Sequence, residues 1–311
     1  MVNHLISIII PAYNEEECVA ELAKRLQKLF IEEPKYQFEV IVIENGSTDS
    51  TWSKLQEISA QDSRFKIVQL SRNFRMDGGL TAGLEYATGD ACVLMTADLQ
   101  DPPEMISIFL RKWEDGWENI YGVVTEREGT GPIRRMNSKL FYWVANKLSD
   151  RRLPKNASDF RLVDKKVYET VRTLTERNRF VRGLFAWVGF KSIGIPMSRP
   201  PRFGGVSNAH TFKVIDLAFK GIFANSYKPL RFITLFGMGL SFVSFLTILP
   251  LSFLWIFRGV PFAGFGTLVS LFLLVLGILS FMIGVLSEYV GLIYEEVKGR
   301  PNYVVSETIG L

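Results

Sequence analysis

Side chains that bind transition metals or form disulfides are scarce in this sequence of 311 residues. It contains two cysteines, Cys18 and Cys92, and two histidines, His4 and His210. The cysteines lack the spacing of a metal site, and we expect both to be buried, reduced thiols. Neither histidine belongs to a motif, so we expect neither to take part in chemistry.

Strong charge of one sign is also missing. The formal net charge is +4, and no basic run is interleaved with aromatic residues, which argues against a nucleic-acid partner. The sequence has no internal repeat and no low-complexity segment. The first residues lead directly into an apolar run rather than into a basic region and a signal core, so we expect no cleaved signal sequence.

Hydrophobic residues make up 48% of the chain, and most of the excess lies after Arg231. Two apolar stretches, 232–257 and 262–286, each exceed the roughly 20 residues that cross a bilayer. Only Arg258–Pro261 separates them, which predicts a two-helix transmembrane hairpin. Just before them, apolar residues recur at helical spacing over 212–227, which predicts an amphipathic helix on the membrane surface.

Lysine and arginine flank the outer ends of the hairpin more densely than its turn. The outer set is Lys220, Lys228, Arg231, Lys298 and Arg300, against Arg258 alone in the turn. The positive-inside rule then puts the large domain and both termini in the cytoplasm. We therefore expect a multi-pass protein of the inner or plasma membrane. Gly237, Gly239, Gly277 and Gly284 would permit close helix packing, so a homo-oligomer is possible.

In the first half, short apolar runs alternate with helical patterns. Strands are predicted at 5–10, 38–43, 66–70 and 91–95, and further strands at 119–124 and 159–162. Asn14 and Glu17 resemble a capping box at the start of a helix that ends near Phe30. Asp164 is predicted to cap another helix. This alternation predicts a doubly wound, mainly parallel α/β sheet with its site at the carboxyl edge.

The apolar run that ends at Met95 is followed by Asp98 and Gln100. Two residues apart at the end of a strand, their side chains would point the same way, so both oxygens could reach one Mg²⁺ or Mn²⁺ ion. A helix cap is the alternative, with Asp101 as N-cap and Pro102 in the first turn. The cap would account for Asp101 and would leave Asp98 and Gln100 without a role.

A loop that contains both arginine and glycine covers 199–207. Arginines close to glycines could hold a diphosphate, and a solvated loop is the alternative interpretation.

Several stretches together resemble family 2 glycosyltransferases of the GT-A fold, in particular the polyprenyl-phosphate sugar transferases. These include the bactoprenol glucosyltransferases and the transferases similar to dolichol-phosphate mannose synthase. The matching segments are Ser7–Glu16, Asn45–Thr51, Gly83–Asp90, Ala97–Glu104, Asp159–Leu162, Arg202–Ser207 and Glu288–Pro301. The resemblance spans nearly the whole chain.

The resemblance implies a GT-A, Rossmann-like domain over 1–210, an interfacial helix over 211–229, a transmembrane hairpin over 230–293 and a cytoplasmic tail over 294–311. It implies inverting transfer of a sugar, with UDP-glucose as the best candidate donor, to a polyprenyl phosphate in the bilayer. Catalytic roles would fall to Asp98, Asp159 and Arg202. Nucleotide-sugar contacts would come from Pro11, Tyr13, Glu15, Asn45, Asp98, Arg161, Arg199 and Arg202. The lipid phosphate would lie near Arg127 and Arg134, and Mg²⁺ or Mn²⁺ on Asp98 and Gln100.

The chain departs from the family pattern at two places. The family usually has two acids where this chain has Glu44-Asn45, and an acid where it has Thr96. Two other functions remain open, a processive synthase because it shares the fold, and a binding protein because of these departures. A processive polysaccharide synthase is disfavoured, because the Gln-x-x-Arg-Trp signature is missing and two helices enclose no pore. A non-catalytic, membrane-anchored protein that binds nucleotide sugars is the other.

Overall fold

The computed structural model describes residues 4–126, 157–200, 203–204 and 264–311, and between them residues 230, 231, 233–239, 242, 243, 246, 253 and 257. The sequence interpretations of the loop after Glu126, the helix near Arg134 and the amphipathic helix over 212–227 lie outside these residues.

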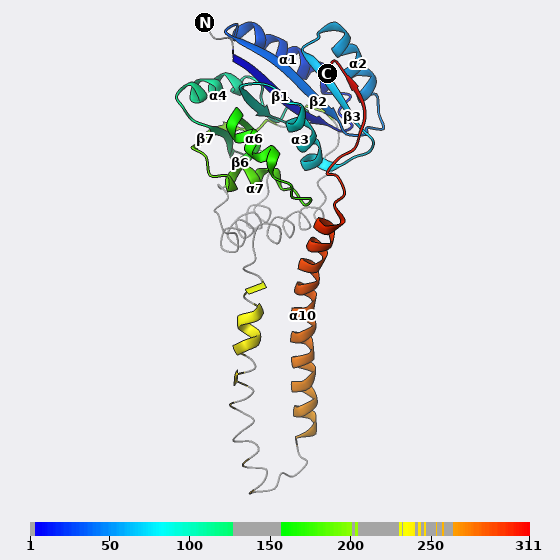
Figure 1. Cartoon of the computed structure of the whole chain (residues 1–311), viewed down its shortest axis with the longest axis vertical. Helices are drawn as coiled ribbons and strands as arrows, with labels where there is room; N and C mark the ends of the chain where they lie inside the picture. Colours follow the sequence, from blue (N-terminus) through cyan, green and yellow to red (C-terminus); the bar gives the residue numbers. More distant parts are fainter. Residues whose placement is uncertain are drawn as a thin grey trace.

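The predicted alternation of strands and helices is confirmed over the first 126 residues (Figure 1). The elements there are β1 His4–Ala12, α1 Val19–Glu32, β2 Tyr36–Glu44, α2 Thr51–Gln61, β3 Phe65–Leu70, α3 Arg75–Tyr86, β4 Ala91–Leu94, α4 Met105–Glu114 and β5 Asn119–Glu126. The later elements are β6 Ala157–Asp164, α6 Lys165–Thr173, α7 Val181–Trp187, β7 Ser192–Ser198, α10 Phe265–Lys298 and β8 Val305–Ile309.

One mixed sheet of eight strands joins these elements in the order β7-β5-β6-β4-β1-β2-β3-β8. The central strands β4, β1, β2 and β3 are parallel, as the sequence predicts. Strand β6 runs antiparallel to both β4 and β5, and β7 is parallel to β5. The sheet is therefore a doubly wound α/β sheet, mainly parallel, in which β6 and the edge strand β8 run in the opposite direction.

Both faces of the sheet are covered, which explains why the central strands are continuous apolar runs. Ile6, Ile8 and Ile10 of β1 pack with residues of α1, α2 and α4 on one face. Ile9 of β1 and Leu94 of β4 pack with residues of α3, α6 and α7 on the other face. Cys18 and Cys92 are buried and not joined by a disulfide, as predicted.

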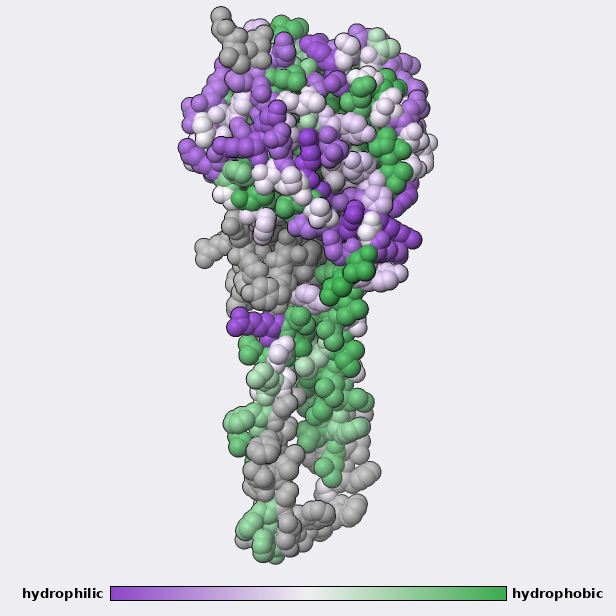
Figure 2. All heavy atoms as spheres, in the orientation of Figure 1, coloured by the Kyte–Doolittle hydropathy of each residue, from purple (hydrophilic) through white to green (hydrophobic). Residues whose placement is uncertain are grey.

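Among the described residues, α10 is the one helix long and apolar enough to cross a membrane. Its 34 residues span about 51 Å at ~1.5 Å per residue. The part from Phe265 to Ser287 carries no charge and covers about 34 Å, enough for the ~30 Å hydrocarbon core. Charged residues begin at Glu288. Figure 2 shows hydrophobic side chains along α10 and hydrophilic ones over the globular part.

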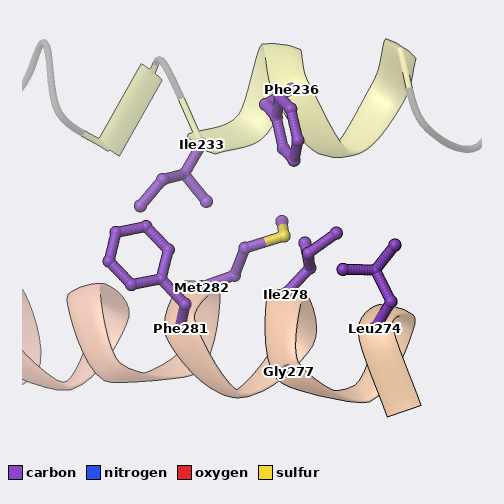
Figure 3. Close-up of a pocket in the computed structure, with 7 residues that line it drawn as sticks. All are labelled: Ile233, Phe236, Leu274, Gly277, Ile278, Phe281 and Met282. Carbon is purple, nitrogen blue, oxygen red and sulfur yellow. The ribbon is translucent and has the colours of Figure 1, made fainter. Parts of the chain in front are cut away.

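The start of the other predicted span lies beside α10. Ile233 and Phe236 face Leu274, Ile278, Phe281 and Met282 across an apolar cavity of about 470 Å³ (Figure 3). At Gly237 the two segments touch, because a Cβ there would lie 2.8 Å from the Met282 methyl. Most of this span lies outside the described residues, so the complete hairpin stays a prediction.

The C-terminal residues form an edge strand of the main sheet, which the sequence interpretation had treated only as a tail. After α10 ends at a left-handed Gly299 (φ 64°), the chain turns and β8 pairs antiparallel with β3. The register aligns Val305 with Leu70 and Ile309 with Ile67. The apolar helix is therefore joined directly to the sheet (Figure 1).

Two of the three predicted helix caps are wrong. Asn14 does not cap α1, which begins at Val19; Asn14 adopts a left-handed conformation (φ 54°) and its side-chain oxygen accepts from the Thr48 N–H. Asp101 does not cap α4, because it is fully buried against Thr96. The Asp164 cap of α6 is confirmed, since its side chain accepts from the Lys166 N–H.

Candidate functional site

Five loops meet at one edge of the sheet because of the strand directions. The parallel strands β1, β2 and β4 end there. Strand β6, which is antiparallel to β4, begins there, and β5 and β7, which run parallel to β4, end there. Residues 11–15, 44–49, 95–101, 157–161, 198–200 and 203–204 therefore gather at the carboxyl edge, where open α/β sheets bind ligands.

Hydrogen bonds between side chain and backbone hold together the loops after β1 and β2. The Asn14 N–H donates to Ser47 Oγ at 3.0 Å, and the Glu15 N–H donates to Thr51 Oγ1 at 2.9 Å. Pro11 is buried at the end of β1, whereas Tyr13 and Glu15 are half-buried. Of these three residues predicted to bind the nucleotide, only Tyr13 and Glu15 therefore present part of their surface at the edge.

The side chain of Asn45 connects β2 to the start of α3. Its Nδ2 donates to the Arg75 carbonyl at 2.9 Å, and its Oδ1 accepts from the Phe74 N–H at 2.8 Å. Asn45 is 3% exposed. The same helix lies very close to β1, because a Cβ on Gly79 would be 3.0 Å from Pro11 Cβ. The Asn45 amide therefore holds the start of α3 beside the carboxyl edge of the sheet. Its nitrogen and its oxygen both already have a hydrogen-bond partner there.

Asp98 and Gln100 do lie together at the edge, but not on a strand. Strand β4 ends at Leu94, and the two residues occupy a turn in which Leu99 is left-handed (φ 58°). Asp98 Oδ1 accepts from the Gln100 N–H at 3.2 Å and from the Thr96 hydroxyl at 2.7 Å. The alternation argument from the sequence is therefore wrong for this pair, although the proximity that it predicted is present.

The turn offers oxygen ligands suited to a hard cation. Asp98 and Gln100 are half-buried, and Gln100 Nε2 donates to the Pro200 carbonyl at 3.5 Å, whereas its Oε1 accepts no hydrogen bond from the residues that the structure describes. Within the described ranges, three or more His, Cys, Asp or Glu side chains do not cluster as a complete metal site. One carboxylate and one amide oxygen fit a Mg²⁺ or Mn²⁺ ion whose remaining ligands are phosphates and water.

Thr96, one of the two departures from the family pattern described above, bridges two carboxylates. Its hydroxyl lies 2.7 Å from Asp98 Oδ1 and 2.8 Å from Asp101 Oδ2, and its N–H also donates to Asp101. Burial raises the pKa of Asp101, against the opposing charge of Arg199, whose Nη2 lies 3.6 Å away. A threonine hydroxyl has one hydrogen, so it can donate to only one of the two carboxylates at a time.

A second charged cluster surrounds Asp159 at the beginning of β6. Arg182 of α7 pairs with both carboxylate oxygens, with Nε 2.8 Å from Oδ1. Arg161 is buried, and its guanidinium donates to the carbonyls of Asp159 and Ser158 and lies over the Phe185 ring at 4.9 Å. Burial lowers the pKa of Arg161 to about 10. Three arginines, including Arg199, therefore surround one carboxylate.

The charge state of Asp159 follows from these neighbours. Burial disfavours the ionised form. The ion pair with Arg182 outweighs burial, with further help from Arg161 and Arg199, and the pKa of the carboxyl lies below its usual value. Asp159 is therefore ionised at neutral pH and ill suited to carry a proton.

The sequence interpretation missed Arg182. A single arginine on a short amphipathic helix carries no signal of its own, and only the fold shows its ion pair. Arg127, Arg134 and Arg202 lie outside the described residues, so their predicted roles stay predictions. Of the described residues in this loop, Phe203 donates its N–H to the Asp98 carbonyl at 3.5 Å, and Gly204 lies against Glu17.

Comparison with known sequences gives a match along the chain. The profile described as glycosyl transferase family 2 matches residues 7–172. An uncharacterized glycosyltransferase, sll0501, of Synechocystis is 38% identical over 98% of this chain and 96% of its own. The uncharacterized glycosyltransferase YkcC of Bacillus subtilis is 37% identical over 98% and 94%. A prophage-derived bactoprenol glucosyl transferase of Shigella flexneri is 34% identical over 97% and 98%.

Proposed function

Because this chain belongs to glycosyl transferase family 2 and is a glycosyltransferase, we propose that it transfers a sugar to the phosphate of a polyprenyl phosphate. The best candidate donor is UDP-glucose, and direct displacement at the anomeric carbon would invert it. The full-length similarity to the bactoprenol glucosyl transferase of Shigella flexneri supports both the lipid acceptor and the glucose donor.

The direction of β8 is the observation that carries this proposal. Strand β8 follows α10 and runs antiparallel to β3, with the Ser71 N–H donating to the Val304 carbonyl at 2.9 Å. The carboxyl end of β3 therefore lies on the side of α10 (Figure 1). The carboxyl edge that carries Asp98 and Asp159 then faces the bilayer if α10 crosses it. A prenyl chain stays in the bilayer, so its phosphate can be reached only from this side.

The chemistry needs no strong general base. The second pKa of a phosphate monoester is ~6, so the attacking oxygen is largely ionised at neutral pH. The lowered pKa of Asp159 agrees with this requirement. An ionised carboxylate held by Arg182 can accept a hydrogen bond from a sugar hydroxyl without removing its proton. His4 lies next to Asp90 near the start of β1, at the opposite edge of the sheet.

The departing nucleoside diphosphate requires relief of negative charge. Asp98 and Gln100 would hold a Mg²⁺ or Mn²⁺ ion, which supplies that relief when bound. Arg199 and the neighbouring Arg202 would face the diphosphate from the loop after β7, and arginine suits phosphate through paired donors. Asn45 would act indirectly, by positioning the start of α3.

We also propose that the chain is a multi-pass protein of the inner or plasma membrane, with its domain and termini in the cytoplasm. Accessibility of single cysteines tests this arrangement. A Glu307→Cys thiol on the exposed face of β8 should react with an impermeant reagent only after the cells are opened. An Arg258→Cys thiol should react in intact cells. Reaction of both residues from the same side would refute the hairpin.

Transfer of labelled sugar tests the reaction directly. The full chain in detergent is mixed with undecaprenyl phosphate, Mg²⁺ or Mn²⁺, and one labelled UDP- or GDP-sugar at a time. We expect one donor, UDP-glucose first, to label the lipid, and the label to vanish with a chelator or in Asp98→Ala. Asp115→Ala is the matched control, because Asp115 pairs with Lys112 on the surface, away from the edge.

Two other outcomes would overturn the proposal. Nucleotide binding without transfer from any donor would favour a binding protein in which Thr96 and Asn45 replace the usual acids. Formation of a sugar polymer rather than a single lipid-linked sugar would favour a processive synthase.

A further inference from the structure

We propose that Arg182 is the positioning residue for Asp159, and that helix α7 carries Arg182 to the carboxyl edge of the sheet. This inference rests on the proposed function, since it assigns a role within the same site. Arg182 Nε lies 2.8 Å from Asp159 Oδ1, and its Nη2 donates to Oδ2. Such a paired contact sets the plane of the carboxylate as well as its charge.

The other two arginines cannot replace this contact in the described structure. Arg161 points its guanidinium at main-chain carbonyls and at the Phe185 ring. Arg199 is directed at Asp101 instead. Both influence the Asp159 carboxylate only through their charge. In the described part of the chain, the paired donors on the Asp159 carboxylate therefore come from Arg182.

The start of α7 is itself held by α3. Asp77, in the first turn of α3, accepts a hydrogen bond from the Val181 N–H at 2.9 Å. Val181 is the first residue of α7, and Arg182 follows it. The beginning of α3 is in turn held by Asn45. A continuous series of contacts thus runs from the end of β2 to the carboxylate of Asp159.

The pair leaves Asp159 able to bind substrate. Each carboxylate oxygen has two lone pairs, so a carboxylate that accepts one bond per oxygen from arginine can still accept hydroxyl groups. Its side chain is 28% exposed. We therefore assign to Asp159 the orientation of a sugar hydroxyl, and to Arg182 the fixed direction of that carboxylate.

The test compares Arg182→Gln, Arg182→Lys and Asp159→Asn in the transfer assay, with Arg172→Gln as the structural control. Arg172 donates to the carbonyls of Leu84 and Ala87 and lies outside the proposed site. We expect Arg182→Gln to lower kcat roughly 10- to 100-fold, the range for loss of a group that orients a ligand. KM for the nucleotide sugar should change little. Arg182→Lys should restore activity only in part, because lysine lacks the planar paired donors.

The pH profile separates positioning from general stability. The charged groups that face Asp159 are Arg182 of α7, Arg161 of β6, Arg199 after β7 and Asp77 of α3. Without Arg182, burial should dominate and raise the pKa of Asp159, so the residual activity should increase with pH over the range 5–8. Arg172→Gln should keep the wild-type profile, and Arg182→Gln combined with Asp159→Asn should lose the pH dependence.

Thermal unfolding gives a readout that needs no activity. In Arg182→Gln, a carboxyl with a raised pKa should make stability fall as pH rises from 5 to 8, and Asp159→Asn should remove this fall. A wild-type pH dependence of both activity and unfolding in Arg182→Gln would refute the inference. The inference would also be refuted if the loss of activity in the double variant equalled the product of the losses in Arg182→Gln and Asp159→Asn alone. A wild-type protein without transferase activity would instead refute the proposed function.

Discussion

Asn45 and Arg75 are joined by a hydrogen bond from the buried Asn45 amide to the Arg75 main-chain carbonyl, 2.9 Å long. Arg75 is the first residue of α3 and is left-handed (φ 64°). The Asn45 oxygen accepts from the preceding residue, Phe74. An aspartate at position 45 could still accept a hydrogen bond from the Phe74 N–H, but it would have no hydrogen to donate to the Arg75 carbonyl. The amide is thus matched to this turn.

Asn45→Asp should therefore destabilise the protein. The substitution puts a carboxylate oxygen against the Arg75 carbonyl, and a buried pair of acceptors without a hydrogen costs about 1–3 kcal/mol. Thermal unfolding of the full chain should show a Tm lower by about 2–4 °C per kcal/mol. Gln37→Glu makes the same change of amide to acid at an exposed position of β2 and should leave Tm unchanged. An Asn45→Asp protein as stable as wild type would contradict the role of the amide.

A carboxylate at position 96 should make the protein depend on a divalent cation. Thr96→Asp would put a third carboxylate beside Asp98 and Asp101, where the threonine hydroxyl now donates. We expect a lower Tm in chelator, by an amount equivalent to about 1–3 kcal/mol, and a larger rise with Mn²⁺ than in wild type. Thr96→Val loses the same hydroxyl without adding charge. Equal responses of the two variants to Mn²⁺ would show that no cation binds there.

Part of this site could be predicted from the sequence because its signals are local. Apolar strands that end in polar residues mark the carboxyl edge, and Asp98 and Gln100 were placed there correctly. Their shared turn was not predictable, because it depends on Leu99 adopting a left-handed conformation that leucine rarely takes. The sequence predicts Asn45 as a nucleotide-sugar contact, and only the contact with α3 shows its structural role.

The remainder depends on pairings between residues far apart in the sequence. The reversed direction of β6, which brings Asp159 to the edge, is set by pairing with β4 and β5. The contact between Asp159 and Arg182 joins a strand to a helix that no motif marks. Strand β8 follows a long apolar helix, and its alternation over five residues is too short to distinguish a strand from a polar tail.

Asp77 should make stability depend on pH in a direction unusual for a carboxyl group. Burial raises its pKa to about 6, and the nearby charge of Asp159 adds to the shift. The folded state then binds a proton more tightly than the unfolded state, so this contribution is full below pH ~4 and is lost as pH rises through 6. Asp77→Asn keeps an oxygen for the Val181 N–H. It should stabilise the protein at pH 8 by up to about 3 kcal/mol.

Unfolding measured from pH 4 to pH 8 checks the effect of Asp77. The gain from Asp77→Asn should shrink to nothing near pH 4, where both proteins are neutral at this position. Asp115→Asn removes an exposed carboxyl whose side chain is 56% accessible, and should show no such trend. A stabilisation by Asp77→Asn that is the same at all pH values would contradict the assigned proton.

Pairing of β8 with β3 should be needed for the stability of the globular part, because β8 covers an edge whose own residues are buried. Ile67 and Val68 of β3 are 0% exposed, and half-buried Val305 and Ile309 pack against the two sides of the core. Ile309→Asp should lower stability by about 1–3 kcal/mol, because it places an unpaired charge there, and Val305→Asp should do the same. Thr308→Asp adds the same charge at an exposed position of the strand and should have little effect. Thermal unfolding would report the loss of stability in each variant, and cleavage by protease near the C-terminus would report the release of β8 from β3. If all three variants unfold and resist cleavage like wild type, the strand does not hold α10 to the sheet, and the orientation of the carboxyl edge toward the membrane loses its support.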